Sequence, residues 1–323
     1  MVPTIDDVLA ARRRIAPYAV TTPLIEHPAL NALCGGRVLL KAETLQRVGA
    51  FKFRGAYNAV SQIDRTQFSG GVVACSSGNH AQGVAAAATL CGLKSVIVMP
   101  TDAPRLKLQR TKDFGAEVVT YDRETEDRDA IAMRICAERA AAFVHPYDNA
   151  HVIAGQGTVG LEIMEQAAAV GATPDAVLVC CSGGGLVTGI ALAVKAAHAA
   201  AEVFTVEPAG FDDFARSLRS GQREKNVKKS GSICDALMAN QPGVINFDIA
   251  QRTLSGGLVV TDDEVRRAMR FAFFELKLVV EPGGAAALAA ILADKIPVRG
   301  RTIAAVLSGG NVDPLEFAGV INA

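Results

Sequence analysis

Apolar and polar positions along the 323-residue chain follow two alternating patterns. Short runs rich in β-branched residues are typical of buried parallel strands; they are residues 71–77, 94–100, 116–122, 175–182, 202–208 and 302–310. Alanine-rich segments of helical length separate them; they are residues 80–93, 104–115, 128–142, 186–201 and 262–277. This order predicts an α/β fold with doubly wound parallel sheets, in which ligands bind beyond the carboxyl ends of the strands.

A glycine-rich turn follows one of these predicted strands. The stretch CSGGGLVTG, residues 181–189, places three consecutive glycines at the start of a predicted helix. Backbone N–H groups of such a turn can point at an anion, and the helix N-terminus adds positive potential, so a phosphate site is favoured over a simple tight turn. The glycine spacing differs from G-x-G-x-x-G, but Glu207 after the next strand could bind a ribose. A nicotinamide-dependent dehydrogenase is therefore a competing prediction.

Two more polar loops lie at predicted strand ends. The stretch SSGNH, residues 76–80, combines hydroxyl, amide and imidazole groups, which suit a carboxylate ligand and a helix N-cap about equally well. The stretch LSGGNVD, residues 307–313, could present the neutral hydroxyl of Ser308 to a ligand. Taken alone, this second loop would be interpreted as a turn.

Lys52 has an unusual setting for a lysine, because Phe51 and Phe53 flank it and Arg54 follows. Apolar neighbours and a nearby cation disfavour the ammonium form and lower the pKa from its usual value of ~10.4. Alone, Lys52 would be interpreted as a surface lysine with its stem against apolar neighbours. Together with a phosphate loop and a hydroxyl partner, it meets the requirements of pyridoxal 5'-phosphate (PLP), which needs a partly neutral lysine for a Schiff base.

Composition excludes several classes of protein. The chain has 33 lysine and arginine residues and 33 aspartate and glutamate residues. It therefore lacks the excess of basic residues that is typical of nucleic-acid-binding proteins. No apolar run approaches the ~20 residues of a membrane span, and the N-terminus lacks the pattern of a signal peptide. The seven cysteines form no CxxC pair, which indicates reduced thiols in a cytoplasmic protein rather than a zinc or redox site.

Six motifs in this order resemble the fold-type II PLP family of serine/threonine dehydratases and serine racemases: LQRVGAFKFRGAYNAV, SSGNHAQG, HPYDNAHVIAGQGTVGLEI, SGGGLVTG, EPAGFDD and LSGGNVD. The resemblance covers nearly the whole chain. It implies a fold similar to the tryptophan synthase β subunit, with two doubly wound parallel-sheet domains and the cofactor between them. The large PLP-binding domain would comprise residues 1–50 and 148–323, and the small domain residues 51–147. The family likeness also implies a homodimer.

The resemblance implies cofactor-binding roles for individual residues. Lys52 would form the Schiff base and act as the base at Cα, and Phe51 would pack on the cofactor. Asn79 would bind the ring hydroxyl, and Ser308 the pyridine nitrogen. A serine there leaves that nitrogen neutral, which suits β-elimination more than transamination. The phosphate would be held by the N–H groups of Gly183, Gly184, Gly185 and Leu186.

The resemblance likewise implies a substrate site, formed by Ser76, Ser77, Asn79, His80 and Arg128. Ser77 is similar to the serine that acts on the opposite face of the substrate in serine racemases and related 3-hydroxyaspartate dehydratases. Arg128 occupies the place of a family arginine that could clamp a second carboxylate, although a surface arginine is an equal alternative.

A divalent-cation site is implied by EPAGFDD, with the carboxylates of Glu207 and Asp213 and the carbonyl of Phe211 as ligands. Such oxygen ligands suit Mg²⁺ or Ca²⁺, with Mn²⁺ as a further candidate. Two positions depart from the family pattern: Ser182 replaces the first glycine of the phosphate loop, and Ala236 replaces a glycine near the ring.

The function predicted from these motifs is a PLP-dependent ammonia-lyase that converts β-hydroxy-α-amino acids into 2-oxo acids. The expected order of substrates is 3-hydroxyaspartate, then L-serine, then L-threonine. A serine or aspartate racemase is the nearest alternative. A nicotinamide-dependent dehydrogenase, and a PLP-binding carrier or regulatory protein without turnover, remain as alternatives from other classes.

Overall fold

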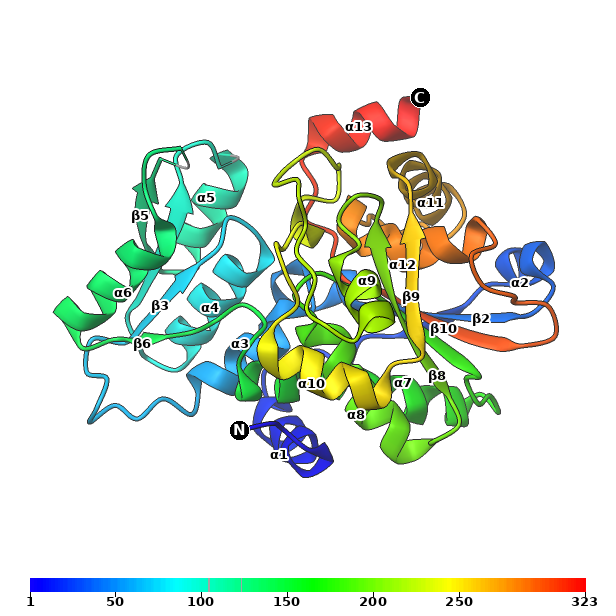
Figure 1. Ribbon diagram of the computed structural model, residues 1–323, viewed down its shortest axis with the longest axis horizontal. Coiled ribbons are helices and arrows are strands. Elements are labelled where there is room, and N and C mark those ends of the chain that lie inside the picture. Colours follow the sequence, from blue (N-terminus) through cyan, green and yellow to red (C-terminus); the bar gives the residue numbers. More distant parts are fainter. Residues whose placement is uncertain (104, 123) are drawn as a thin grey trace.

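The computed structural model describes residues 1–103, 105–122 and 124–323 and shows an α/β protein built on two sheets (Figure 1). Pro104, the first residue of one predicted helix, lies outside the described residues. The six predicted strands are all present within their predicted runs. The α/β class and the parallel sheets are therefore confirmed.

The larger sheet has the strand order β1-β2-β10-β7-β8-β9, and its neighbours are parallel except for the pair β1 and β2. Its strands are β1 (Leu24–Glu26), β2 (Arg37–Ala42), β7 (Ala176–Cys180), β8 (Glu202–Pro208), β9 (Gly256–Val260) and β10 (Thr302–Leu307). The smaller sheet is parallel throughout, in the order β5-β4-β3-β6. Its strands are β3 (Val72–Cys75), β4 (Ser95–Pro100), β5 (Glu117–Tyr121) and β6 (Ala142–Phe143). The predicted domain limits enclose the smaller sheet and remain a prediction.

Helices pack around both sheets and join the two halves of the molecule (Figure 1). The first seven are α1 (Ile5–Ile15), α2 (Pro28–Cys34), α3 (Lys52–Val60), α4 (Asn79–Leu90), α5 (Arg105–Asp113), α6 (Arg128–Arg139) and α7 (Ala150–Ala169). The others are α8 (Gly185–Ala197), α9 (Asp213–Ser220), α10 (Val244–Thr253), α11 (Asp262–Phe274), α12 (Pro282–Leu292) and α13 (Pro314–Asn322). Within the described residues, no helix is both long enough and apolar enough to span a bilayer.

Helix α3 is held close to α7 by a contact between two glycines. A Cβ atom at Gly155 would lie 2.6 Å from the Cα atom of Gly55 and 2.7 Å from the carbonyl oxygen of Arg54. Only glycine allows the two helix backbones to approach this closely. The contact fixes the helix that begins at Lys52 against the longest helix of the described chain.

A buried ionic network also anchors α3. The Arg54 guanidinium donates to the Glu43 carboxylate at 2.8 Å and to the Glu162 carboxylate at 2.6 Å, and Lys41 donates to Glu162 at 2.6 Å. Burial of an ion pair carries a desolvation cost, so such networks fix geometry more than they add stability. The sequence had predicted that Arg54 would help to disfavour the ammonium form of Lys52. That prediction is wrong, because two carboxylates neutralise Arg54 and it is not among the causes that lower the Lys52 pKa.

Candidate active site

Lys52 lies at the first position of α3 and points into the protein. Its Nζ donates a hydrogen bond of 2.8 Å to the carbonyl oxygen of Pro146 and lies 5.2 Å from the centre of the Phe51 ring. Burial lowers the pKa of Lys52 to about 8. Phe53 turns away and packs on Tyr57 in the core, so only one of the two flanking phenylalanines contacts the amine. A lysine that loses its proton so readily can form an imine with an aldehyde.

The glycine loop lies between β7 and α8, as its sequence predicted. Gly184 has a φ of +101°, which favours glycine, and caps the helix. A Cβ atom at Gly183 would lie 2.3 Å from the Tyr147 ring, and one at Gly184 would lie 2.4 Å from the Phe214 ring. The first N–H groups of α8 have no partner within the helix, so together with the dipole they suit a phosphate group. The loop therefore fits the phosphate of PLP.

Ser182, the departure from the family's glycine, has a structural role at this loop. Its hydroxyl accepts a hydrogen bond of 3.1 Å from the backbone N–H of Ala239. This bond ties the start of the glycine loop to the segment after Asp235–Leu237, a short 3₁₀ helix that contains Ala236. The two positions that depart from the family pattern, Ser182 and Ala236, thus lie in segments joined by this hydrogen bond.

Ser308 and Lys52 are joined through the backbone. The N–H of Phe51 donates to the carbonyl oxygen of Ser308 at 3.0 Å, and Ala50 forms a bridge with Gly309. Ser308 is buried at the end of β10. The Cys180 thiol, at the end of the neighbouring strand β7, interacts with the Ser308 hydroxyl and with Lys52. Cys180 belongs to the site, and the sequence indicated it only as a strand residue.

The loop between β3 and α4 lies near Lys52, whose charge affects the pKa of His80. The Ser76 hydroxyl accepts from the N–H of Gly78 at 3.1 Å, and Ser77 is half-buried beside it. His80 is buried, and its Nε2 lies 3.0 Å from the Val144 carbonyl oxygen. Burial and then the Lys52 charge lower the pKa of His80 to about 3, so the ring is neutral and Nε2 carries the proton. Any N–H that His80 offers to a carboxylate is therefore that of its backbone.

Asn79 begins α4 and is bonded at both ends of its amide. Nδ2 donates to Glu281 Oε1 at 2.6 Å, and Oδ1 accepts from Asn311 Nδ2 at 2.8 Å. Burial raises the pKa of Glu281 to about 7. Glu281 is a site residue that the sequence pattern did not reveal. The residue precedes Pro282 and two glycines at a helix start, and an N-cap was the only signal available.

Arg128 lies at the start of α6, and its side chain is 55% exposed. Its Nε is 3.5 Å from the Asp129 carboxylate. It is close enough to affect the pKa values of His145 and Tyr147, on the segment that receives the Lys52 hydrogen bond. Arg128 therefore lies at the rim of the site and makes no contact with Lys52.

The predicted cation site is buried near the glycine loop. The Glu207 carboxylate accepts from the N–H groups of Phe214 at 2.8 Å and Ala215 at 2.7 Å. Asp213 Oδ1 accepts from Asn226, whereas Oδ2 is buried with no hydrogen-bond partner among the described residues. Burial raises the pKa of Asp213 to about 6 and the pKa of Glu207 well above its usual range. An unpaired buried carboxylate oxygen fits a cation, although no group of three or more His, Cys, Asp or Glu side chains gathers around a common point in the described chain.

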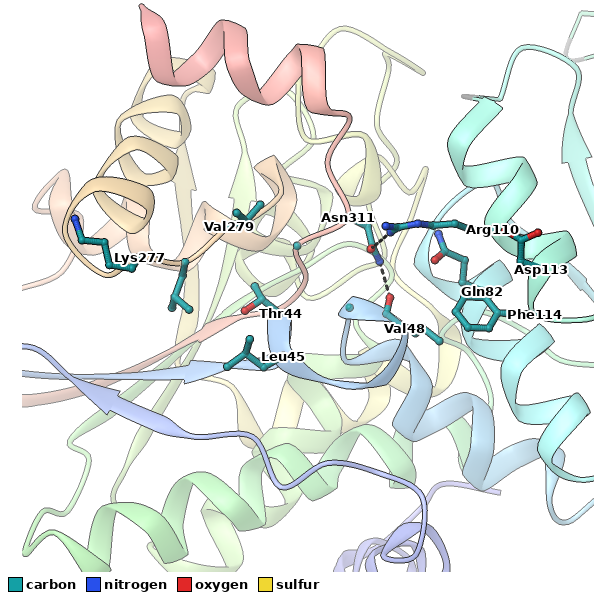
Figure 2. Close-up of a pocket in the computed structure, with 13 residues that line it drawn as sticks. Thr44, Leu45, Val48, Gln82, Arg110, Asp113, Phe114, Lys277, Val279 and Asn311 are labelled. Carbon is teal, nitrogen blue, oxygen red and sulfur yellow. Dashed lines mark hydrogen bonds between the residues drawn. The ribbon is translucent and has the colours of Figure 1, made fainter.

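A separate cleft of about 680 Å³ adjoins the candidate active site near Asn79 (Figure 2). Its lining includes Thr44, Val48, Gln82, Arg110, Lys277 and Asn311. Figure 2 shows Asn311 between Arg110 and the backbone of Val48. Lys52 and the glycine loop do not line this cleft, so it is distinct from the cofactor site.

Comparison with known proteins agrees with this geometry. The sequence model of the family described as "Pyridoxal-phosphate dependent enzyme" matches residues 15–309. The L-threo-3-hydroxyaspartate ammonia-lyase of Saccharomyces cerevisiae is 40% identical over 100% of this chain and 97% of its own length. The serine racemase of Schizosaccharomyces pombe is 38% identical over 98% of this chain and 97% of its own length.

Solved structures of related enzymes have the same fold as this chain. The threonine deaminase of T.th. superposes with a TM-score of 0.91 and 42% identity, over 96% of this chain and 99% of that chain. Maize serine racemase superposes with a TM-score of 0.93 and 36% identity, over 100% of this chain and 98% of that chain. The predicted fold type is therefore confirmed.

Proposed function

Because the chain belongs to the pyridoxal-phosphate-dependent enzyme family, we propose that it is an ammonia-lyase acting on β-hydroxy-α-amino acids. The observation that carries the proposal is the Lys52 amine, whose pKa burial lowers to about 8. This amine donates to the Pro146 carbonyl and affects the pKa of His80 in the SSGNH loop, while the preceding residue, Phe51, donates to the Ser308 carbonyl. We propose 3-hydroxyaspartate as the first substrate, giving oxaloacetate through iminosuccinate, followed by L-serine and L-threonine. The similarity to hydroxyaspartate ammonia-lyases supports this order.

Bound PLP supplies an electron sink for the negative charge that develops at the substrate Cα. Lys52 would hold the cofactor and, with substrate bound, would remove the Cα proton from one face. Ser308 would offer a neutral hydroxyl to the ring nitrogen, which would leave that nitrogen uncharged. The N–H groups of the glycine loop would hold the phosphate.

The SSGNH loop would bind the substrate α-carboxylate through the hydroxyls of Ser76 and Ser77 and the backbone N–H groups of Asn79 and His80. After Lys52 has removed the Cα proton, the β-hydroxyl would take up a proton from a neighbouring group and leave as water. The released enamine rearranges to an imine, and its hydrolysis gives the 2-oxo acid and ammonia. Arg128 would bind the second carboxylate of hydroxyaspartate by turning from Asp129 into the site.

Racemisation is the second candidate function. Ser77 is half-buried on the SSGNH loop, from which it would return a proton to the opposite face of the same Cα atom. The similarity to serine racemases supports this candidate. Ser77→Ala should abolish racemisation and leave elimination measurable, because Lys52 still removes the proton.

The decisive experiment combines an absorbance spectrum with a product assay. The purified protein should show the visible band of bound PLP, and Lys52→Ala should lack it. The sample is then mixed with L-serine, L-threonine and each isomer of 3-hydroxyaspartate while 2-oxo acid is measured. A band without oxo acid from any substrate would refute the lyase, and the absence of a band would refute a PLP enzyme.

We also propose a Mg²⁺ or Ca²⁺ site at Glu207, Asp213 and the Phe211 carbonyl. The unpaired Asp213 Oδ2 and the raised pKa values of both carboxyl groups support it, because a cation would compensate their buried charge. Mg²⁺ should raise the melting temperature of the parent, the more so as the pH rises through about 6, where Asp213 loses its proton. Asp213→Asn should remove that effect. An equal melting temperature of the parent with Mg²⁺ and with chelator would refute the site.

The homodimer and the cytoplasmic location inferred from the sequence remain part of this proposal. Sedimentation of the purified protein tests the first, since a dimer of the 33.7 kDa chain separates clearly from a monomer. Fractionation of the source cells tests the second.

A further inference from the structure

Glu281 is a fully buried carboxylic acid in the candidate site, and the reaction described above gives it no role. It lies directly before α12 and is 3% exposed. Its N–H donates to the carbonyl oxygen of Gly309 at 3.0 Å, and a Cβ atom at Gly309 would lie 2.2 Å from Glu281 Oε1. The carboxyl group therefore lies on the turn that follows Ser308.

The hydrogen bonds around Asn79 form one chain with a fixed direction. Arg110 donates to Asn311 Oδ1 at 3.0 Å (Figure 2). Asn311 Nδ2 has two hydrogens, and it donates one to the Val48 carbonyl and one to Asn79 Oδ1, each at 2.8 Å. Because Arg110 can only donate, the Asn311 amide cannot be reversed, and Asn79 must receive a hydrogen bond at its oxygen.

The count of donors and acceptors also determines which hydrogen bond the amide nitrogen of Asn79 makes. With its oxygen facing Asn311, the Asn79 amide nitrogen faces Glu281 and donates one hydrogen at 2.6 Å. An amide nitrogen has two hydrogens, so one N–H of Asn79 remains without a partner among the described residues. Glu281 and Asn311 therefore hold the amide from both sides and leave a single donor to point elsewhere.

We propose that Glu281 is a positioning residue that orients the Asn79 amide, so that its remaining N–H is presented to the ring oxygen of PLP. The inference rests on the proposed PLP chemistry and extends it to a residue that would not itself touch the reacting atoms. Asn79 and Arg110 come from the half of the molecule with the smaller sheet, whereas Asn311 and Glu281 follow or precede elements of the other half. The chain of hydrogen bonds thus also joins the two halves at the cofactor.

The protonation of Glu281 should change this arrangement. As a carboxylate, Glu281 is a strong acceptor for Asn79; once protonated, it becomes a weaker acceptor and gains an O–H that competes as a donor. Burial and then Asp235 raise the pKa of Glu281 to about 7, while Lys107 and the Asn79 hydrogen bond lower it. Cys180, on β7, is the further titratable group that interacts with it. The visible spectrum of bound PLP should therefore change with a midpoint near pH 7.

The test compares Glu281→Gln with Glu316→Gln. Glu316 is exposed on α13, and its pKa is also affected by Asp235 and Lys107, but no hydrogen bond joins it to Asn79. The holoenzyme spectrum is recorded from about pH 5.5 to 8.5, around the Glu281 pKa, and PLP affinity is measured with apoenzyme. Glu281→Gln should lose the spectral transition near pH 7 and bind PLP about tenfold more weakly. Glu316→Gln should keep both properties of the parent.

An unchanged transition in Glu281→Gln, or its loss in Glu316→Gln, would overturn the inference. Asn311→Leu serves as a second variant if Glu281→Gln does not fold. It removes the other support of the Asn79 amide, so PLP affinity should fall while the transition near pH 7 remains; unchanged affinity would overturn the inference. Both readouts concern PLP binding, so a protein that binds PLP but forms no oxo acid would refute the lyase and leave the role of Glu281 tested.

Discussion

The glycine contact between α3 and α7 predicts a measurable loss of stability when a single methyl group is added. We consider Gly155→Ala, because its new Cβ atom would lie 2.6 Å from the Cα atom of Gly55, 2.7 Å from the carbonyl oxygen of Arg54 and 2.9 Å from the Cβ atom of Asn58. Contacts between carbon atoms are favourable at about 3.5–4.0 Å. The helices must therefore separate by about 1 Å to restore an ordinary contact.

Two opposing effects determine how much stability Gly155→Ala loses. Overpacking of a tight contact costs about 1–3 kcal/mol. Replacing glycine by alanine inside a helix returns up to about 1 kcal/mol. Two of the three contacted atoms belong to the backbone, so no side-chain rotation can relieve the clash. Because the clash cannot be relieved, the upper part of the overpacking cost applies, about 2–3 kcal/mol. After subtraction of the gain of about 1 kcal/mol, we expect the free energy of unfolding to fall by about 1–2 kcal/mol.

Urea unfolding, followed by circular dichroism, measures this loss as a lower midpoint. Gly319→Ala is the matched control, because Gly319 lies in α13 and a Cβ atom there would meet nothing within 4 Å. It should raise stability by up to about 1 kcal/mol. If Gly155→Ala unfolds at the same urea concentration as the parent or above it, the reasoning from the glycine contact is refuted.

Three further predictions concern the site and its support. Glu43→Gln leaves the buried Arg54 with one carboxylate fewer and should lower the free energy of unfolding by about 3–5 kcal/mol, read from the urea midpoint; a loss below about 1 kcal/mol would contradict it. The rate at which apoprotein binds PLP should rise as the pH passes through about 8, since Lys52 is mostly ammonium below its pKa and neutral above it; stopped-flow absorbance would show a flat profile if burial does not lower this pKa. Gly183→Ala should weaken PLP binding at least tenfold, because its Cβ atom would lie 2.3 Å from the Tyr147 ring, and equal affinity by equilibrium dialysis would disprove the tight loop.

Patterns within short segments of the sequence were sufficient to predict much of the fold and part of the candidate site. The six apolar runs are strands, and the glycine loop and Lys52 lie where their neighbours in sequence predicted. The strands β1, β2, β6 and β9 were not predicted; β1 and β6 have only three and two residues, too short for a periodic pattern. Such strands form because neighbouring strands provide hydrogen bonds, which a local pattern cannot reveal.

Residues brought together by distant parts of the chain could not be predicted in this way. Glu281 is 202 positions from Asn79 in sequence, yet the two are directly bonded. Cys180 reaches Ser308 only because β7 and β10 pair in the sheet. Arg54 was expected to act on Lys52 because the two are close in sequence, but the carboxylates that determine its environment come from Glu43 and Glu162.

The strand order of the larger sheet determines when the protein can acquire its cofactor during synthesis. Strand β10 lies between β2 and β7, although it is made more than 100 residues after either of them. The smaller sheet, by contrast, comes from one continuous stretch of residues 72–143 and can form early. The nascent chain therefore carries an open gap in its larger sheet until the last strand leaves the ribosome. The chain acquires Ser308, and with it the last part of the proposed cofactor site, only after more than 100 residues beyond β7 have been made.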